Sequence, residues 1–259
     1  MVELTRTIRF AVGGPAEAGP VHNGFAGWPA MAGLGAHYEL DVACRGEPDP
    51  VTGYFLNITA IDAAGRRDAI PVIRSAFGVR GAEPTRTLAT ALRALEADLP
   101  GLSRVRWRLS PTYSLEMEPT DMTSALIRQS FEFAAAHRLH VPSLSDEENR
   151  RIFGACNNPA GHGHNYRVEP CVRVPVADGA PGFTLRDLER ITGAVLIDHL
   201  DHTHLNADVP EFKDLNPSVE NIARVCFDRL APAIREAGAE LARITVWETE
   251  KTSCVYPAG

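Results

Sequence analysis

The second half of the chain contains the hexapeptide GHGHNY at residues 161–166, and the first half contains a weaker copy, GLGAHY, at residues 33–38. The upstream segments also correspond, because FAAAH at 133–137 precedes the second copy as FAVGG at 10–14 precedes the first. A repeat determines how the whole chain divides, so it is considered before single elements. We expect two similar units in tandem, and the alternative is chance similarity between two strand-and-helix segments.

Each unit is expected to run strand, strand, helix, helix, strand, strand. In the second unit, residues 130–137 and 166–174 resemble strands, and residues 243–249 and 253–256 are the expected closing strands. The boundary between the units is expected near residues 119–123, just after the last strand of the first unit.

Helices are predicted where apolar residues recur with a period of 3.6 residues. In the second unit one helix is expected to begin after Thr184 as its N-cap, and another near Ser218. In the first unit, residues 58–81 are less periodic and richer in Arg and Gly, so the first helix there is expected to be degraded. The apolar faces of the two helices in the second unit are Leu185, Leu188, Ile191, Val195 and Leu196, and Val219, Ile222, Cys226, Leu230 and Ile234.

Composition and charge exclude several classes of protein. The 259 residues are 44% hydrophobic and 23% charged, which is typical of a globular chain. The 26 Lys and Arg against 33 Asp and Glu give a net charge of -7, which argues against nucleic-acid binding. No apolar run approaches the roughly 18 residues of a membrane helix, and the first residues lack the apolar core of a secretory leader. Five widely spaced cysteines suggest free thiols, so a cytoplasmic location is expected.

Three histidines have the spacing of a metal site. His162 and His164 are two residues apart on a predicted strand, so their rings lie on the same face. His137 ends the preceding strand and reaches that face if the two strands pair. Three imidazoles without a fourth protein ligand are the composition of a catalytic zinc site, which keeps a position open for water or substrate. The alternative is a set of hydrogen-bonded or solvent-facing histidines.

Two further groups carry acid–base chemistry. Cys156 begins a turn-rich loop before His162, where a thiol can act as a base or a nucleophile, although a bystander thiol is the alternative. Residues 198–204 (DHLDHTH) concentrate three histidines and two carboxylates at the end of a predicted helix. The adjacent Asp201 and His202 can relay protons. A helix C-terminus carrying surface histidines is the other interpretation.

Five motifs over residues 130–257 resemble the 6-pyruvoyl-tetrahydropterin synthase family in order and in spacing. The first half fits only as a degenerate copy, although residues 49–53 (DPVTG) look like the turn after the family's second strand. The five motifs are EFAAAHRL at 132–139, CNNPAGHGHNY at 156–166, LDHTHLN at 200–206, PSVEN at 217–221 and VWET at 246–249.

The resemblance implies an α+β fold of two tandem T-fold units, in which an antiparallel sheet is backed by two helices. Such sheets join between subunits into a barrel, so a homo-oligomer is expected. Residues 1–120 would form a degenerate, non-catalytic T-fold, and residues 121–259 a catalytic, zinc-binding T-fold. The degenerate unit would supply sheet edges or one wall of a neighbouring site.

The resemblance also implies the roles of individual residues. In the family's pattern Glu248 holds the amino and ring-nitrogen hydrogens of the pterin, and Ser218 stands where the family usually has a threonine in the pterin pocket. The remaining matches are His137, His162 and His164 as ligands of Zn²⁺, Cys156 as the catalytic cysteine, and Asp201 and His202 as its partner pair.

The implied reaction converts 7,8-dihydroneopterin triphosphate into 6-pyruvoyl-tetrahydropterin with release of triphosphate. The Asn-Asn-Pro turn between Cys156 and His162 favours this product. Alternatives are 6-carboxytetrahydropterin synthase of the queuosine pathway, which releases acetaldehyde, a non-catalytic zinc- or pterin-binding protein, and a zinc hydrolase that would use Glu248 as its base. Arg138, Lys251 and other arginines are candidates for binding the triphosphate, and the sequence does not select among them.

The first half departs from the family's pattern at each functional position. Gly14, Leu34 and Ala36 stand where zinc ligands would be, Leu109 stands opposite Glu248, and no cysteine precedes Gly33. We therefore expect this half to be non-catalytic. Its histidines, His22 and His37, are expected to be structural.

Overall fold

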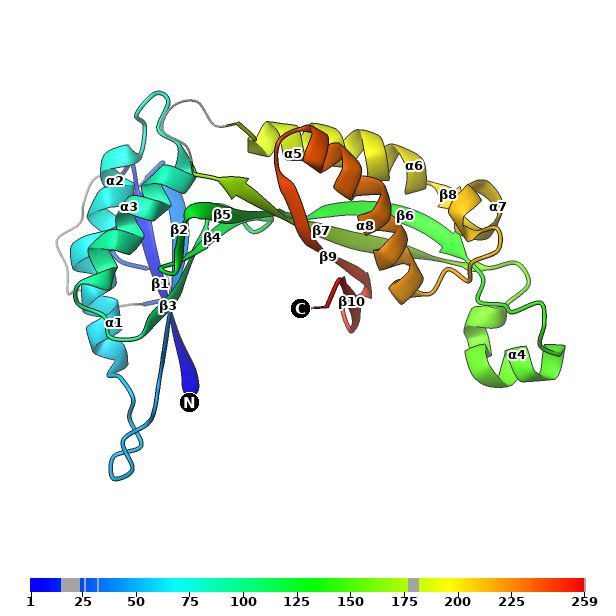
Figure 1. Cartoon of the computed structure of the whole chain (residues 1–259), viewed down its shortest axis with the longest axis horizontal. Helices are drawn as coiled ribbons and strands as arrows, with labels where there is room; N and C mark the ends of the chain where they lie inside the picture. The colour runs from blue at the N-terminus through cyan, green and yellow to red at the C-terminus, as the bar shows by residue number, and fades with distance from the viewer. Residues whose placement is uncertain (15–23, 26, 32, 177–181, 259) are drawn as a thin grey trace. The chain divides into compact units, whose positions relative to one another are not determined.

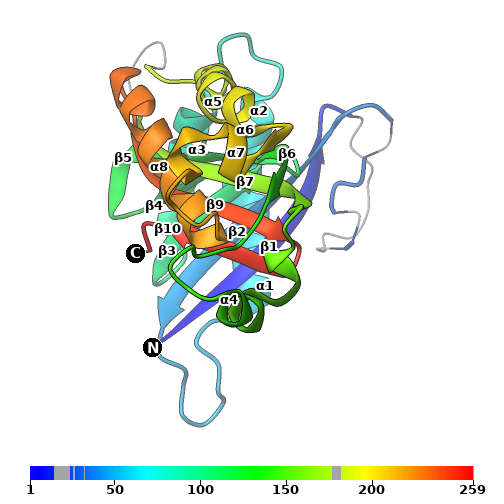
Figure 2. The same ribbon diagram turned by 90° about the vertical axis from the view of Figure 1, so that its right-hand side faces the viewer.

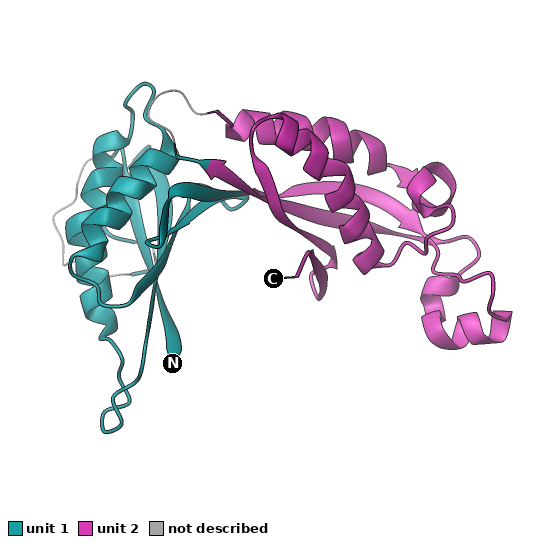
Figure 3. Ribbon diagram, in the orientation of Figure 1, with its two compact units in different colours: residues 1–127, 175–181 teal, residues 128–174, 182–259 magenta. Residues whose placement is uncertain are grey.

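The computed structural model describes residues 1–14, 24–25, 27–31, 33–176 and 182–258. His22 lies outside these residues. The chain forms two compact units (Figure 3): unit 1 is Met1–Ile127 with Pro175–Pro181, and unit 2 is Arg128–Val174 with Gly182–Gly259. The division falls within strand β5 (Asp121–Gln129), so residues 121–127 are grouped with unit 1. The boundary after residue 120 that the sequence suggests stays a prediction.

Unit 1 is an antiparallel sheet with helices over one face (Figure 1). Neighbouring strands follow the order β1-β2-β3-β4. The core lies between sheet and helices, where Phe10, Leu40 and Leu92 are fully buried. The elements are β1 (Val2–Val12), β2 (Ala36–Gly46), α1 (Ile58–Ala64), α2 (Ile70–Ala76), α3 (Pro84–Glu96), β3 (Leu102–Arg108) and β4 (Tyr113–Glu118).

The first helix of unit 1 is complete, so the prediction that it is degraded was wrong. A π-helical turn, Gly65–Ala69, joins α1 directly to α2. A π turn inserts residues into the helical repeat and shifts the apolar face. The buried positions Ile61, Gly65, Ala69 and Ile73 therefore recur every four residues. The 3.6-residue period is interrupted for this reason, and periodicity alone missed the helix.

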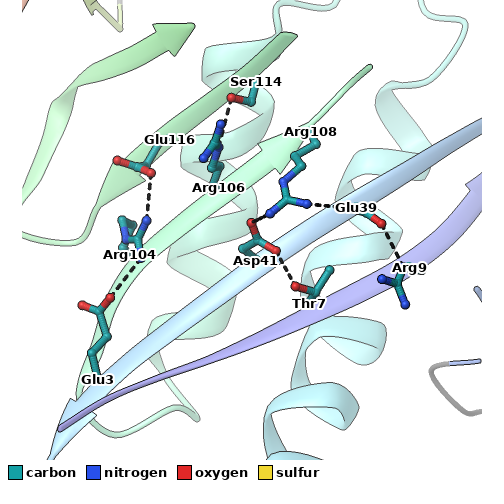
Figure 4. Close-up of polar contacts among 10 residues, drawn as sticks. All are labelled: Glu3, Thr7, Arg9, Glu39, Asp41, Arg104, Arg106, Arg108, Ser114 and Glu116. Atoms are coloured by element: carbon teal, nitrogen blue, oxygen red, sulfur yellow. Dashed lines mark hydrogen bonds and ion pairs between the residues drawn. The ribbon is translucent and has the colours of Figure 1, made fainter. Parts of the chain in front are cut away.

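The other face of the unit 1 sheet carries a network of charged side chains (Figure 4). Asp41 accepts hydrogen bonds from Thr7 Oγ1 and Arg108 Nη2, both at 2.6 Å. Arg108 also donates to Glu39 at 2.6 Å, and Glu39 accepts a bond from Arg9 Nε at 2.8 Å. These residues alternate along their strands with the apolar core residues, so all of them lie on one face. A second group on this face comprises Glu3, Arg104 and Glu116, with Arg104 donating to both carboxylates.

Unit 2 contains a second mixed α+β arrangement. Strand β7 pairs antiparallel with both β6 and β9, β9 pairs antiparallel with β10, and the short β8 runs parallel to β6. Helices α5 and α8 lie over one face of these strands (Figures 1 and 2). The strands are β6 (Phe131–His137), β7 (His162–Pro175), β8 (Thr203–His204), β9 (Glu240–Thr249) and β10 (Thr252–Tyr256). The helices are α4 (Asp146–Phe153), α5 (Leu185–Thr192), α6 (Asp198–Leu200), α7 (Leu205–Asp208) and α8 (Val219–Glu236).

The helices of unit 2 begin where the sequence predicts. The Thr184 side chain accepts a hydrogen bond from Asp187 N, and the Asp187 side chain accepts one from Thr184 N. These two bonds form a capping box. Ser218 caps α8. A π turn, Gly193–Ile197, again separates α5 from α6. It places the fully buried positions at Leu188, Leu196 and Leu200, whereas Val195, predicted for the inner face, is only half-buried.

The two units share a cross-strand aromatic pair. Phe10 faces Tyr38 across β1 and β2, and Phe133 faces Tyr166 across β6 and β7. The ring centroids lie 5.9 Å apart in the first pair and 5.0 Å apart in the second. These four residues occupy matching positions of the two sequence copies, so the pairing supports the alignment that suggested a repeat.

Two expectations from composition can be compared with the structure. All five cysteines are unpaired, in agreement with the prediction of free thiols. Among the described residues, no helix combines the length and the apolar character that crossing a bilayer requires.

Candidate metal and acid–base site

The three predicted histidine ligands lie together in unit 2. Antiparallel pairing of β6 with β7 sets His137 opposite His162 and Ala135 opposite His164. The Nε2 atoms of His137 and His162 are 3.1 Å apart, and one nitrogen from each of the three rings lies within 4.8 Å of the others. Within the described residues this group contains only histidines. The strand register therefore produces the cluster that the sequence predicts.

His137 is held by the chain just before α8. The ring is fully buried, and its Nδ1–H donates a hydrogen bond of 2.7 Å to the carbonyl oxygen of Pro217. This bond fixes the tautomer and leaves the lone pair of Nε2 directed toward the other two rings. Burial lowers the pKa of His137, and it also lowers the pKa of His164. Both shifts favour the neutral imidazole, which is the form that binds a metal ion.

The cluster fits a metal ion better than it fits a set of hydrogen-bonded histidines. His164 Nε2 is buried and has no hydrogen-bond partner, which is costly for a ring nitrogen. A cation at the centre of the three rings would satisfy this atom together with the Nε2 atoms of His137 and His162. Three imidazoles leave one position open in a four-coordinate site.

Glu248 of β9 adds a carboxylate beside the rings. Its Oε1 lies 3.5 Å from His137 Nε2 and 3.9 Å from His164 Nε2, and the side chain is 20% exposed. Glu248 stands outside the group of candidate metal ligands. The carboxylate is therefore available to accept hydrogen bonds from a molecule bound at the site.

Asp201 and His202 form the predicted pair, attached to the edge of β6. Asp201 Oδ1 accepts a bond of 2.7 Å from Ala134 N, and Asp201 Oδ2 lies 2.8 Å from His202 Nδ1. These two contacts, that with Ala134 first, lower the pKa of Asp201 and keep it ionised. His202 adopts a φ of 58°, which lies in the left-handed region that is unfavourable for residues other than glycine. The ring is 84% exposed, and Asp201 orients it as the carboxylate of a proton relay does.

His202 and His164 line a common shallow hollow of about 340 Å³. Cys156 lies in the 3₁₀ turn Gly154–Asn157 that precedes β7, and its carbonyl oxygen accepts a bond of 2.9 Å from Leu139 N. Burial raises the pKa of the Tyr166 hydroxyl, and the charges of Glu248 and of a Cys156 thiolate add to this rise. Cys156 is half-buried, and the Tyr166 hydroxyl lies 3.4 Å from His137 Nδ1.

Ser218 has a structural contact in this chain. Its Oγ accepts a bond of 3.5 Å from Asn221 N at the start of α8, next to Pro217. A capping residue stabilises the first turn of a helix, and here that turn follows the carbonyl that orients His137. A role of Ser218 toward a pterin stays a prediction.

Sequence reasoning missed the backbone groups that complete the site. The Pro217 carbonyl and the Ala134 amide carry no side-chain information, so no residue pattern identifies them. The sequence also did not identify Gly161 as a residue that the site requires. Gly161 adopts a φ of +73°, and a Cβ at this position would lie 2.7 Å from His204 Nε2. The pattern of alternating residues from His162 and His164 to Tyr166 would have placed Tyr166 on the metal face.

Replacing Gly161 with alanine is expected to destabilise the protein by about 1–2 kcal/mol, because a side chain disfavours left-handed backbone. The new Cβ would also lie 3.0 Å from the His137 carbonyl oxygen, so metal content should fall. Denaturant unfolding and elemental analysis measure the two effects. Gly163→Ala is the matched control, since its nearest atom, Ala135 O, is 3.6 Å away. Equal losses in both variants would contradict the expectation.

Unit 1 shows no comparable cluster among its described residues. Leu34 is 97% exposed, Ala36 begins β2, and His37 is exposed on that strand. Gly14 follows β1, where His137 ends β6 in unit 2. The substitutions that the sequence identified therefore leave the described part of the first half without a ligand set.

A family model and several known proteins match part of this chain. A family model described as 6-pyruvoyl tetrahydropterin synthase matches residues 126–258. The 6-pyruvoyl tetrahydrobiopterin synthase of Poecilia reticulata is 44% identical over 126 residues, which cover 48% of this chain and 84% of that protein. The Homo sapiens protein of the same name is 40% identical over 134 residues, which cover 51% and 90%. A solved structure of Caenorhabditis elegans 6-pyruvoyl tetrahydropterin synthase is 35% identical, covers 52% and 96%, and has a TM-score of 0.48.

The histidine cluster, the neighbouring carboxylate and the Asp–His pair form a candidate metal-binding site with groups that can act as acids or bases. The chain belongs to the 6-pyruvoyl tetrahydropterin synthase family, and the matched segment is the half that holds this site. The family resemblance of the five sequence motifs is confirmed.

Proposed function

We propose that the second half of this chain is a zinc-dependent lyase. It converts 7,8-dihydroneopterin triphosphate into 6-pyruvoyl-tetrahydropterin and releases triphosphate. The observation that carries the proposal is the convergence of three imidazole nitrogens within 4.8 Å, beside Glu248. The relatives' names support the reaction, since they are called 6-pyruvoyl tetrahydrobiopterin synthases.

Zinc is the metal that this donor set suits. His137, His162 and His164 would hold it through Nε2, with a fourth position left for the substrate's side-chain hydroxyls. When bound, zinc supplies a Lewis acid that stabilises negative charge on those oxygens. The Pro217 carbonyl keeps His137 in the required tautomer by accepting its Nδ1–H at 2.7 Å.

The chain's own residues move the protons. Cys156, as the thiolate, removes a proton from the carbon that bears a side-chain hydroxyl. His202 returns a proton as the enol forms and triphosphate departs, while Asp201 orients the imidazole through the 2.8 Å contact. The exposure of His202 allows it to exchange the proton with solvent afterwards.

Glu248 fixes the orientation of the pterin. A carboxylate accepts two parallel hydrogen bonds from a guanidine-like edge, such as the amino group and ring nitrogen of a pterin. The 20% exposure of Glu248 leaves it accessible from the site. Ser218 is proposed to line the same pocket.

The proposal extends to the whole chain. Units 1 and 2 are tandem T-folds, of which the first is degenerate and non-catalytic, and copies of the chain join their sheet edges into a barrel. The shared Phe–Tyr pair and the π turn that interrupts one helix in each unit support the repeat. We place the protein in the cytoplasm, with a pterin triphosphate as its small-molecule partner.

The test is incubation of zinc-loaded protein with 7,8-dihydroneopterin triphosphate, with the products identified by mass spectrometry. A 6-pyruvoyl product with free triphosphate is expected. A 6-carboxy product with acetaldehyde would instead assign the same site to 6-carboxytetrahydropterin synthesis. If neither product forms while one zinc is bound per chain, the lyase proposal is wrong and a zinc- or pterin-binding protein replaces it.

Glu248→Gln is expected to raise the KM for the substrate about ten- to a hundredfold. The glutamine amide is uncharged and has only one oxygen, so it cannot accept both pterin hydrogens as the carboxylate can. A hydrogen bond to a charged group contributes roughly 1.5–3 kcal/mol. Steady-state kinetics on metal-loaded protein measure the change. Glu250→Gln, an exposed change two residues further along, is the control. Loss of metal from Glu248→Gln with an unchanged KM would show that the carboxylate serves the metal instead.

A further inference from the structure

A second cavity in unit 2 lies beside the metal site and has a different chemistry. It has a volume of about 370 Å³, and we name it the Arg138–Lys213 cavity after two of its lining residues. Its lining residues come from the segment after β6, from the loop before β7, from β8 and α7, and from the segment before α8. The lining residues that carry the argument are Arg138, His140, His204, Lys213, Asp214 and Asn216.

The cations of this cavity lack carboxylate partners. Within the described part of the chain, Arg138 donates its Nε to the carbonyl oxygen of Asn157 at 3.1 Å and forms no ion pair. Lys213 is exposed and likewise pairs with no described carboxylate. This contrasts with Arg104 and Arg108 of unit 1, which bind two carboxylates each. The lone acidic residue in the lining, Asp214, does not neutralise both cations.

Two histidines add donors. The His140 ring accepts a bond from the Asn157 amide at 3.1 Å through Nδ1, so its proton lies on Nε2. The backbone of His140 is fixed as well, because its N–H donates to Asn216 Oδ1 at 3.1 Å. His204 Nδ1 is buried without a hydrogen-bond partner. The cavity therefore combines two full positive charges with imidazole donors on a rigid frame.

The same segments also carry the metal site. Arg138 directly follows His137, and Asn216 precedes the Pro217 carbonyl that orients the His137 ring. Asn206 fixes this connection, since its Oδ1 accepts from Arg138 N at 2.8 Å and its Nδ2 donates to Arg138 O at 3.0 Å. A ligand that occupies the cavity would lie next to the metal-binding strand.

We propose that the Arg138–Lys213 cavity binds a polyphosphate group. A multiply charged phosphate chain accepts hydrogen bonds from several donors at once, and an arginine and a lysine with free donors are the side chains that bind it. The inference rests on the proposed function in one respect, because the group it assigns to the cavity is the triphosphate of the proposed substrate. Arg138 and Lys213 would then hold the triphosphate before and during its departure.

The test uses inorganic triphosphate as the probe and the full, zinc-loaded chain. Titration calorimetry gives its affinity for the unchanged protein, for Lys213→Gln and for Lys251→Gln. Lys213 and Lys251 are the chain's two lysines, and Lys251 lies in the turn between β9 and β10. We expect Lys213→Gln to weaken binding about tenfold and Lys251→Gln to leave it unchanged. If the triphosphate removed zinc from the protein, the apparent affinity would change equally in both variants. The metal content measured after each titration detects such a loss.

A second variant separates charge from folding. Arg138→Gln should weaken triphosphate binding by a similar factor, whereas Arg138→Lys should restore much of the affinity because it keeps the charge. Neither Lys213→Gln nor Arg138→Lys should alter binding of 7,8-dihydroneopterin, which lacks the phosphates. The proposal would be overturned if Lys213→Gln had the same affinity for triphosphate as the unchanged protein. It would also be overturned if Lys251→Gln, and not Lys213→Gln, weakened that affinity. A failure of the unchanged protein to bind triphosphate would overturn it as well.

The outcome for the cavity is separable from the outcome for the reaction. Triphosphate binding that depends on Lys213, without either pterin product in the mass-spectrometric test, would retain the cavity and reject the lyase. Product formation with unaltered binding in the Lys213 variant would retain the lyase and reject the cavity.

Discussion

Cys156→Ala is expected to reduce turnover about 10²- to 10⁴-fold, which is the usual contribution of a positioned general base. Metal and pterin binding should persist, because Cys156 is not a member of the histidine cluster and Glu248, the proposed pterin anchor, is unchanged. The change removes a small, half-buried side chain from a short 3₁₀ turn, so the fold should be retained. Steady-state kinetics, metal analysis and pterin titration of the same preparation measure the three properties.

The control for this variant is Cys254→Ala. Cys254 is the other cysteine that is not fully buried, and it lies on β10. It should leave turnover unchanged. Normal turnover in Cys156→Ala would remove the thiol from the mechanism, and loss of metal would show that the thiol belongs to the metal site.

His162→Ala is expected to abolish both metal retention and turnover. It leaves two imidazoles for a cation that requires three protein ligands, and it removes the nitrogen 3.1 Å from His137 Nε2. Elemental analysis after dialysis should give a metal content that falls from one ion per chain toward zero. The unchanged protein, dialysed in parallel, supplies the reference.

His37→Ala is the control in unit 1, where the corresponding strand carries an exposed histidine. It should retain the full metal content. Equal loss of metal from both variants would show that unit 1 also binds metal, and it would contradict the view that the first unit is inactive. A thermal melt of each variant distinguishes loss of metal from loss of the fold.

The strands and the metal cluster were the most predictable features of this chain. His162 and His164 alternate with Gly163 along a strand, and alternation alone puts both rings on one face. His137 joins them because β6 pairs with β7 in the register that sets it opposite His162. The helix starts at Thr184 and near Ser218 were equally predictable, because a short polar side chain before a run of periodic apolar residues favours the first turn of a helix.

The features that sequence could not supply depend on backbone contacts or on irregular helices. The Pro217 carbonyl orients His137 from 80 positions away in the chain, and Ala134 N holds Asp201 across 67. In each contact the partner of the side chain is a backbone group, which no residue type identifies. The π turns in both units break the 3.6-residue period, so the helix at 58–76 was predicted to be degraded, and Val195, predicted to be buried, is half-buried.

The charged network on unit 1 has a consequence for how this sequence can change. Asp41 and Glu116 are 7% and 5% exposed, so removing Arg108 or Arg104 would leave a nearly buried carboxylate with one cationic partner fewer. Loss of both partners together costs less, since no isolated charge remains. Substitutions at Asp41 and Arg108, or at Arg104 and Glu116, are therefore expected to occur jointly. Among related chains these positions should covary in pairs, while the apolar positions between them vary independently.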